Sequence, residues 1–194
     1  MLNYFVRHKI MSTILASCLV LTTTNFACNT SWISTVGQYL PTAIQIAESI
    51  IQLVGMFGSS SAQSDQAAVQ AIGQEATKDY QLLQTLYQQY QATPSPTTQA
   101  QIENILAIIT TNLPAELAAA HIKDQGLLNS VTAAVNTLVT IADTIISQLP
   151  VKSPQLKARK GVLKSTNRLT PAGAKQQWDT LVCKGLSTCT ALVH

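Results

Sequence analysis

The stretch LLNSVTAAVNTLVTIADTIISQL, residues 127–149, decides the fold of this 194-residue chain. Its apolar side chains recur at alternating steps of three and four residues, which is typical of an α-helix with one buried seam. The seam consists of Leu128, Val131, Val135, Leu138, Ala142, Ile145 and Leu149. Strand-like alternation is not sustained anywhere in the chain. We therefore expect an all-α protein.

Two earlier segments carry the same spacing and predict two further long helices. The first contains Ile33, Val36, Leu40, Ala43, Ala47, Ile50, Val54 and Phe57. The second contains Val69, Ile72, Ala76, Leu83, Leu86 and Tyr90, and it is interrupted by Asp79. Proline fixes φ and lacks a backbone N–H, so we expect Pro41 to kink or divide the first of these helices.

Turn and cap residues separate the expected helices. Gly58-Ser59-Ser60-Ser61 divides the first two, and Ser64 is a reasonable start for the second. Ser95 and Pro96 have the residue types of an N-cap and a first turn, which predicts a third helix through Ile109.

A short Ala-rich helix is expected from Leu113-Pro114 to near His121. Asp124 then caps the last core helix, and Pro150 stops it. The fold class is thus an antiparallel bundle of about four helices over residues 28–150, with an additional short C-terminal helix.

The first 28 residues have the order of an export signal. Arg7 and Lys9 supply positive charge, an apolar run follows from Ile10 to about Leu21, and Asn25-Phe26-Ala27-Cys28 closes the segment. The run is shorter than the roughly 20 residues that span a bilayer. The segment resembles a bacterial lipoprotein signal peptide. The resemblance implies removal of residues 1–27, lipidation of Cys28, or alternatively of Cys18, and a location at the periplasmic face of a membrane or at the cell surface.

Four cysteines fit an oxidising compartment. Cys183 and Cys189 are separated by five residues and predict a small disulfide loop, which leaves Cys28 unpaired, as an acylated cysteine would be.

Charge is sparse and unevenly placed. Charged residues make up 11% of the chain, against a usual ~25%. Residues 29–149 carry eight acidic and two basic side chains, whereas residues 150–194 carry eight basic side chains and one acidic one. This asymmetry predicts that the basic tail docks on the acidic body or on an anionic surface.

The residues 151–169 are expected to form an exposed, partly disordered basic linker. Its candidate contacts with anionic lipid headgroups or wall polymers are Lys152, Lys157, Arg159, Lys160 and Lys164. Nucleic acid is not an expected partner, because the aromatic residues that single-strand binders interleave with basic ones are missing.

Residues 170–194 predict a short helix and a tail. Thr170 is the expected cap and Pro171 the first helical residue, while Ala174, Trp178, Leu181 and Val182 share one face. As the largest apolar residue of this region, Trp178 is expected to anchor the helix on the bundle.

No motif for catalysis, a metal or a cofactor is evident. The three histidines, His8, His121 and His194, are isolated, and His121 suits the C-terminal end of a helix. We expect no enzyme activity and no cofactor.

Three functional hypotheses follow. The first is an exported, lipid-anchored bundle with a structural or interaction role, whose partner is an envelope protein or an anionic polymer. The second is a membrane-active, holin-like protein that inserts residues 32–57 and 127–149, although the neutral polar stripe on each segment favours a water-facing helix. The third is a periplasmic binder of a small ligand.

Overall fold

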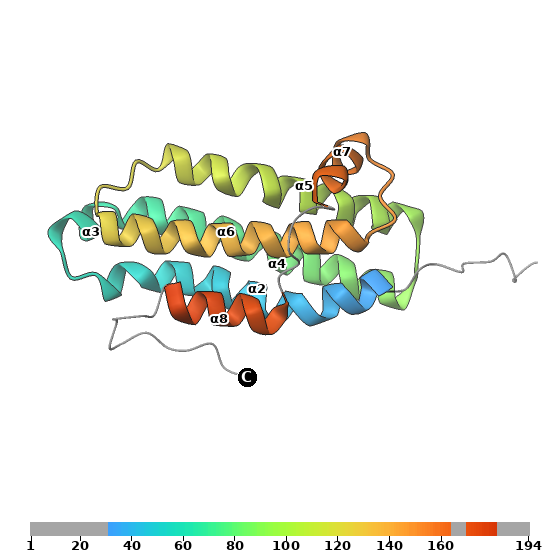
Figure 1. The fold of residues 1–194 in the computed structure, drawn as a ribbon, viewed down its shortest axis with the longest axis horizontal. Helices are drawn as coiled ribbons and strands as arrows, with labels where there is room; N and C mark the ends of the chain where they lie inside the picture. Colours follow the sequence, from blue (N-terminus) through green and yellow to red (C-terminus); the bar gives the residue numbers. More distant parts are fainter. Residues whose placement is uncertain (1–30, 164–169, 182–194) are drawn as a thin grey trace, which may run out of the picture. The chain divides into compact units, whose positions relative to one another are not determined.

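The computed structural model describes residues 31–163 and 170–181. This part of the chain consists of helices and the connections between them and contains no strand, which confirms the all-α prediction (Figure 1). The helices are α2 (Ser31–Met56), α3 (Ser60–Ser64), α4 (Gln66–Ala92), α5 (Pro96–Ala119), α6 (Gln125–Gln148), α7 (Pro154–Leu163) and α8 (Pro171–Leu181).

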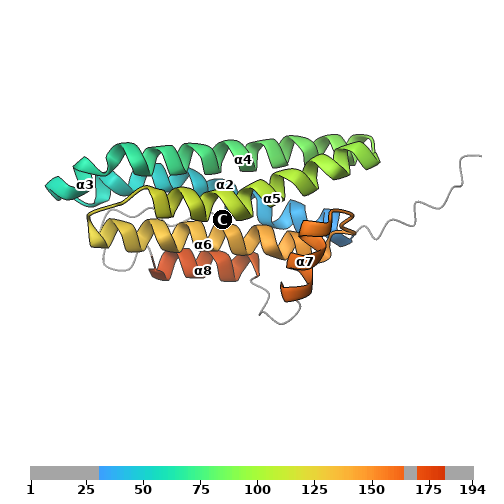
Figure 2. The ribbon, with the colours of Figure 1, turned by 90° about the horizontal axis from the view of Figure 1, so that it is seen from above.

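The four long helices form the predicted antiparallel bundle. Helix α2 packs against α4 and α6, and α5 packs against α4 and α6, so the four helices close around one core (Figure 2). Helices α2 and α4 run in opposite directions, because Gly37 lies against Tyr87 while Ile51, further along α2, lies against Gly73. At the start of α2 the rings of Trp32 and Tyr90 meet with centroids 4.9 Å apart.

The core is built from the predicted seams. All six seam positions of α4 are buried, and so are all seam positions of α6 except Leu128. Helix α6 also buries a second row, Leu127, Ala134, Ile141 and Ile146. It lies between α2 and α5 and also contacts α7 and α8, which explains why its buried face is wider than a single coiled-coil seam.

Three predicted N-caps are confirmed by hydrogen bonds that satisfy otherwise unpaired backbone donors. The Oγ of Ser95 accepts the N–H of Thr98 at 3.0 Å. Asp124 Oδ1 accepts the N–H of Leu127 at 2.9 Å. At α8 the N–H of Gly173 donates to Thr170 at 3.0 Å.

Other predicted boundaries were wrong. Pro41 lies inside one continuous helix α2, so of the two predicted effects, a kink or a division, the division does not occur, and α5 continues through Pro114 to Ala119 instead of ending near Ile109. Both prolines are exposed, so each missing N–H lies on the solvent side while the opposite face stays packed. Ser64 ends the short helix α3 and does not start α4.

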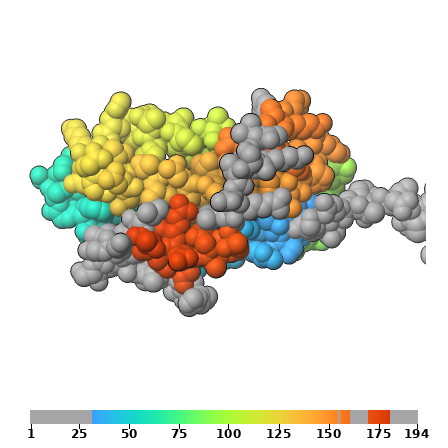
Figure 3. Space-filling view, viewed as in Figure 1, coloured from blue at the N-terminus to red at the C-terminus, as the bar shows by residue number. Residues whose placement is uncertain are grey.

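The predicted basic linker contains a helix, α7, which packs on α5 and α6. Residues 154–163 of the segment expected to be an exposed, partly disordered linker are therefore helical. The C-terminal helix α8 packs on α2 and α6 (Figure 3), with Ala174 and Trp178 buried. Trp178 anchors α8 as predicted, since its side chain is only 1% exposed.

Candidate functional site

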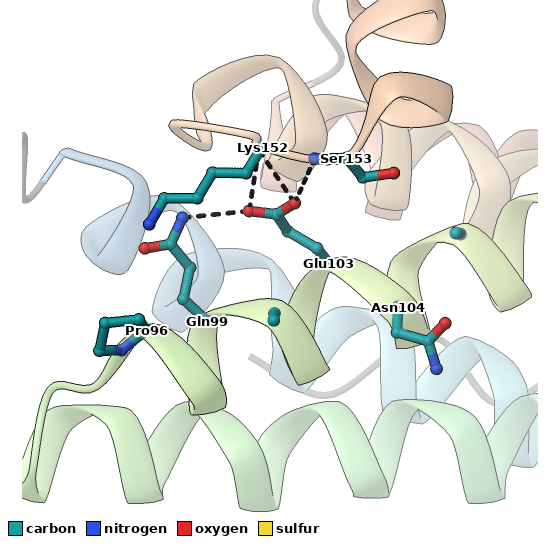
Figure 4. A pocket seen from close by; sticks show the side chains of 8 residues that line it. Pro96, Gln99, Glu103, Asn104, Lys152 and Ser153 are labelled. Atoms are coloured by element: carbon teal, nitrogen blue, oxygen red, sulfur yellow. Dashed lines mark hydrogen bonds between the residues drawn. The ribbon is translucent and has the colours of Figure 1, made fainter.

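A hollow of about 300 Å³ lies between α5 and the segment that leads into α7 (Figure 4). Gln99 and Glu103 form its floor on consecutive turns of α5, and Lys152 and Ser153 form its opposite wall. Gln99 and Glu103 are buried, whereas Asn104 at the rim is exposed.

The Glu103 carboxylate is fully engaged by donors of this hollow. It accepts the backbone N–H of Lys152 at 3.1 and 3.2 Å and that of Ser153 at 3.1 Å. Gln99 Nε2 donates to Glu103 Oε1 at 3.0 Å and to the carbonyl of Pro150 at 3.1 Å. These backbone donors precede α7, so the carboxylate caps the start of that helix. Glu103 therefore holds structure together and has no acceptor position left for proton transfer.

A second carboxylate performs the same task at the other end of the bundle. Asp65 is buried, and its Oδ2 accepts the N–H of Lys123 at 2.7 Å and that of Asp124 at 2.9 Å. Asp124 Oδ2 in turn accepts the hydroxyls of Ser59 at 2.6 Å and Ser61 at 3.1 Å. These bonds join the α5–α6 connection to α3. The hydrogen bond from Ser59, followed by that from the N–H of Leu127, lowers the pKa of Asp124.

A third group of acids lies where α4 meets α5. Asp79 is 4% exposed, and its Oδ2 has no hydrogen-bond partner. Burial first, and then the charge of Glu75, raise the pKa of Asp79 to about 6, with Lys78 opposing and Glu116 adding to the rise. Burial and Glu75 also raise the pKa of Glu116. In the described ranges, no group of three or more His, Cys, Asp or Glu side chains is arranged to hold a metal ion.

An apolar groove of about 380 Å³ follows the exposed side of α4 and α5. Leu82, Leu86, Ile105 and Ile108 line it, and Leu82 is 45% exposed. This groove is larger than the hollow beside Glu103, and it has no charged side chain in its lining.

No family model, curated protein or solved structure matches this chain. The function must therefore be argued from the residues themselves.

The structure brings part of the predicted basic surface onto the body. Arg159 makes a bidentate ion pair with Asp143 of α6, in which Nε lies 2.5 Å from Oδ1 and Nη2 lies 2.8 Å from Oδ2. The Nζ of Lys160 donates to the carbonyl of Leu149 at 2.6 Å. The side chains of Lys152 and Lys157 are exposed.

Several predicted residues lie outside the described residues. They are the leader 1–27, both candidate lipidation sites Cys18 and Cys28, the disulfide candidates Cys183 and Cys189, Lys164, Val182, His8 and His194.

The sequence did not reveal the buried acids. Asp65, Asp79 and Glu103 are each at most 6% exposed. The one signal was Asp79, which breaks the apolar spacing of its helix. The backbone partners of Asp65 and Glu103 lie 49 to 59 residues away in the chain, so no local sequence pattern predicts these hydrogen bonds.

Among the described helices, α6 alone is long and apolar enough to cross a membrane, by length and composition. Of its most apolar window, 61% is buried within the bundle. The apolar character of α6 is thus accounted for by its central place in the core.

Proposed function

We propose that this chain is an exported, lipid-anchored helical bundle of the cell envelope with a structural or interaction role. The observation that carries the proposal is the short distance between the predicted lipid site and the folded body. Helix α2 starts at Ser31, three residues after Cys28, and its first turn already buries Trp32. Three residues span at most about 11 Å, so the anchor would hold the bundle directly at the membrane.

The body supports a binding or structural role more than a catalytic one. The best-formed polar hollow is occupied by Glu103, whose oxygens accept backbone hydrogen bonds. Asp65 is used in the same way at the opposite end. These carboxylates stabilise connections between helices, and the exposed Leu82 groove offers an apolar contact surface for an envelope partner.

The buried face of α6 disfavours the membrane-inserting alternative. Insertion of residues 127–149 would have to expose the apolar core of α2, α4 and α5 or move it into lipid. A lipid-anchored bundle needs no such rearrangement.

The test replaces Cys28 by Ala, with Cys18→Ala as the matched control. We expect the parent chain and the Cys18 variant to be acylated and to stay on the membrane during a carbonate wash. Detergent should then release both from the membrane as compact species. The Cys28 variant should lose the acyl chains. Acylation that persists in Cys28→Ala assigns the anchor to Cys18, and an unprocessed chain in the cytosol overturns the proposal.

A further inference from the structure

The start of α2 and helix α7 lie at the same end of the bundle, called here the α7 end. The ring of Trp32 in the first turn of α2 contacts the ring of Tyr90 in the last turn of α4 in a tilted arrangement. Gln99 near the start of α5 bonds the carbonyl of Pro150, just after α6. Figure 1 shows α7 beside these helix termini. Whatever attaches to the chain before Ser31 therefore joins the bundle at the α7 end.

This end carries four of the seven lysine and arginine residues in the described part of the chain, and two of the four, Lys152 and Lys157, are exposed. It holds Lys152, Lys157, Arg159 and Lys160, against the acids Glu103 and Asp143. Both acids are bound internally, Glu103 by backbone N–H groups and Asp143 by Arg159.

The opposite end has the reverse balance. Acids outnumber lysines there, with Asp65, Glu75, Glu116 and Asp124 against Lys78 and Lys123. The bundle is thus polarised along its axis, and its basic end is the one from which the chain continues toward Cys28.

We propose that the α7 end faces an anionic lipid surface, and that Lys152 and Lys157 contact the phosphate-bearing headgroups. The inference rests on the proposed lipid anchor. An anchor at Cys28 places Ser31 within about 11 Å of the lipid, which is close to the Debye length of about 8 Å at physiological ionic strength. Acyl chains and a basic patch are the two signals that together hold a protein firmly on a membrane.

Lipid fits this surface better than a soluble polyanion does. Two exposed lysines alone bind a free polymer weakly. A lipid tether raises their effective concentration at the membrane, so that the same weak contact contributes to binding there. The basic surface also lacks the interleaved aromatic residues of nucleic-acid binders.

The first experiment measures lysine accessibility in the full chain isolated from cells. The protein is added to vesicles of phosphatidylcholine, with or without about one third phosphatidylglycerol, and the rate of reductive methylation is followed by mass spectrometry. We expect Lys152 and Lys157 to react several-fold more slowly on the anionic vesicles only, and the protection to vanish in high salt. Lys78 and Lys123 should be methylated at the same rate on both kinds of vesicle.

The second experiment compares K152Q/K157Q with the matched control K78Q/K123Q. Each lysine near an anionic surface contributes about a fivefold factor to the partition coefficient, so the first variant should bind anionic vesicles about 25-fold less tightly. The binding of this variant to neutral vesicles should not change. The control variant should bind both anionic and neutral vesicles as tightly as the parent chain does. The Lys152 backbone N–H that bonds Glu103 is kept in the variant, so the fold is preserved.

The outcomes separate this inference from the anchor. Retention on neutral vesicles with equal lysine reactivity on both vesicle types would overturn the α7-end proposal and keep the anchor. Failure to bind neutral vesicles would overturn the anchor, whereas selective protection on anionic vesicles would still support the α7 end. Protection by soluble polyglutamate but not by vesicles would reassign the surface to a polymer and overturn the lipid proposal.

Discussion

Asp65 Oδ2 accepts the backbone N–H of Asp124 at 2.9 Å, while Asp124 itself caps α6 through the N–H of Leu127. Glu103 binds the N–H groups of Lys152 and Ser153 in the same manner at the other end of the bundle. A buried carboxylate thus satisfies backbone donors at each of two helix connections. Charge-assisted hydrogen bonds of this kind are stronger than neutral ones, so these acids stabilise the ends of the bundle.

Replacing Glu103 by Gln should loosen α7. The amide can accept through one oxygen, but its NH₂ group faces backbone donors, which leaves at least one buried N–H without a partner. We expect a loss of about 1–3 kcal/mol in the free energy of unfolding by urea. The exposed neighbour change Asn104→Ala is the control and should have little effect.

Amide exchange checks the same idea locally. The N–H of Lys157 bonds the carbonyl of Ser153 in the first turn of α7 at 3.0 Å. Its exchange should accelerate in Glu103→Gln and not in Asn104→Ala. Unchanged exchange in the Glu103 variant would show that the carboxylate does not cap the helix.

Asp79 should make the bundle less stable as pH rises. The pKa of Asp79 is about 6 in the folded protein and has its ordinary value of 3.8 in the unfolded chain, so the folded state binds the proton more tightly. The associated stability is present below pH 3.8 and is lost as pH rises through 6. Asp79→Asn should therefore be more stable than the parent chain at pH 8, by about 3 kcal/mol, and nearly equal to it at pH 4. Urea unfolding across this range is the measurement.

Glu48→Gln on the exposed side of α2 provides the comparison for Asp79→Asn. It should not gain stability between pH 4 and pH 8. Equal pH profiles for the parent chain and Asp79→Asn would mean that the Asp79 carboxyl is solvated in the folded protein.

Two glycines should respond to alanine in opposite directions. A Cβ at Gly73 would lie 2.6 Å from Ile51 Cγ1 and 3.1 Å from the backbone nitrogen of Ile51, so α2 and α4 would have to separate. We expect Gly73→Ala to cost about 1–3 kcal/mol in the free energy of unfolding. Gly55 is exposed and has nothing within 4 Å of such a Cβ, so Gly55→Ala should stabilise α2 by up to about 1 kcal/mol. Stabilisation by both changes would contradict the close approach of the two helices.

His121 follows the end of α5 with a φ of 47°, a left-handed conformation that glycine adopts without strain. His121→Gly should raise the free energy of unfolding by about 1 kcal/mol. Ala120→Gly, at an ordinary φ of −68°, should lower it instead. A thermal melt of each variant distinguishes the two, and a less stable His121→Gly would contradict the strained geometry.

The sequence predicted those features that arise from local chemistry. The caps Ser95, Asp124 and Thr170 bond N–H groups three residues away, so their residue types alone point to them. The apolar seams likewise follow from helix geometry, and they predicted most of the core positions of α4 and one of the two buried rows of α6.

Features that depend on distant partners were not predictable in this way. Pro114 was expected to start a new helix, but it lies on the exposed side of α5, whose other face is packed in the core. The lysine-rich segment was expected to be partly disordered because the acids that bind it, Glu103 and Asp143, lie on other helices. The hollow beside Glu103 is invisible in the sequence for the same reason.

The mass of the mature N-terminal peptide, isolated from the membrane fraction, tests the central claim most directly. We expect a peptide that begins at Cys28 and carries the added mass of its lipid. A peptide that begins at Met1 without lipid, from protein found in the cytosol, would contradict it.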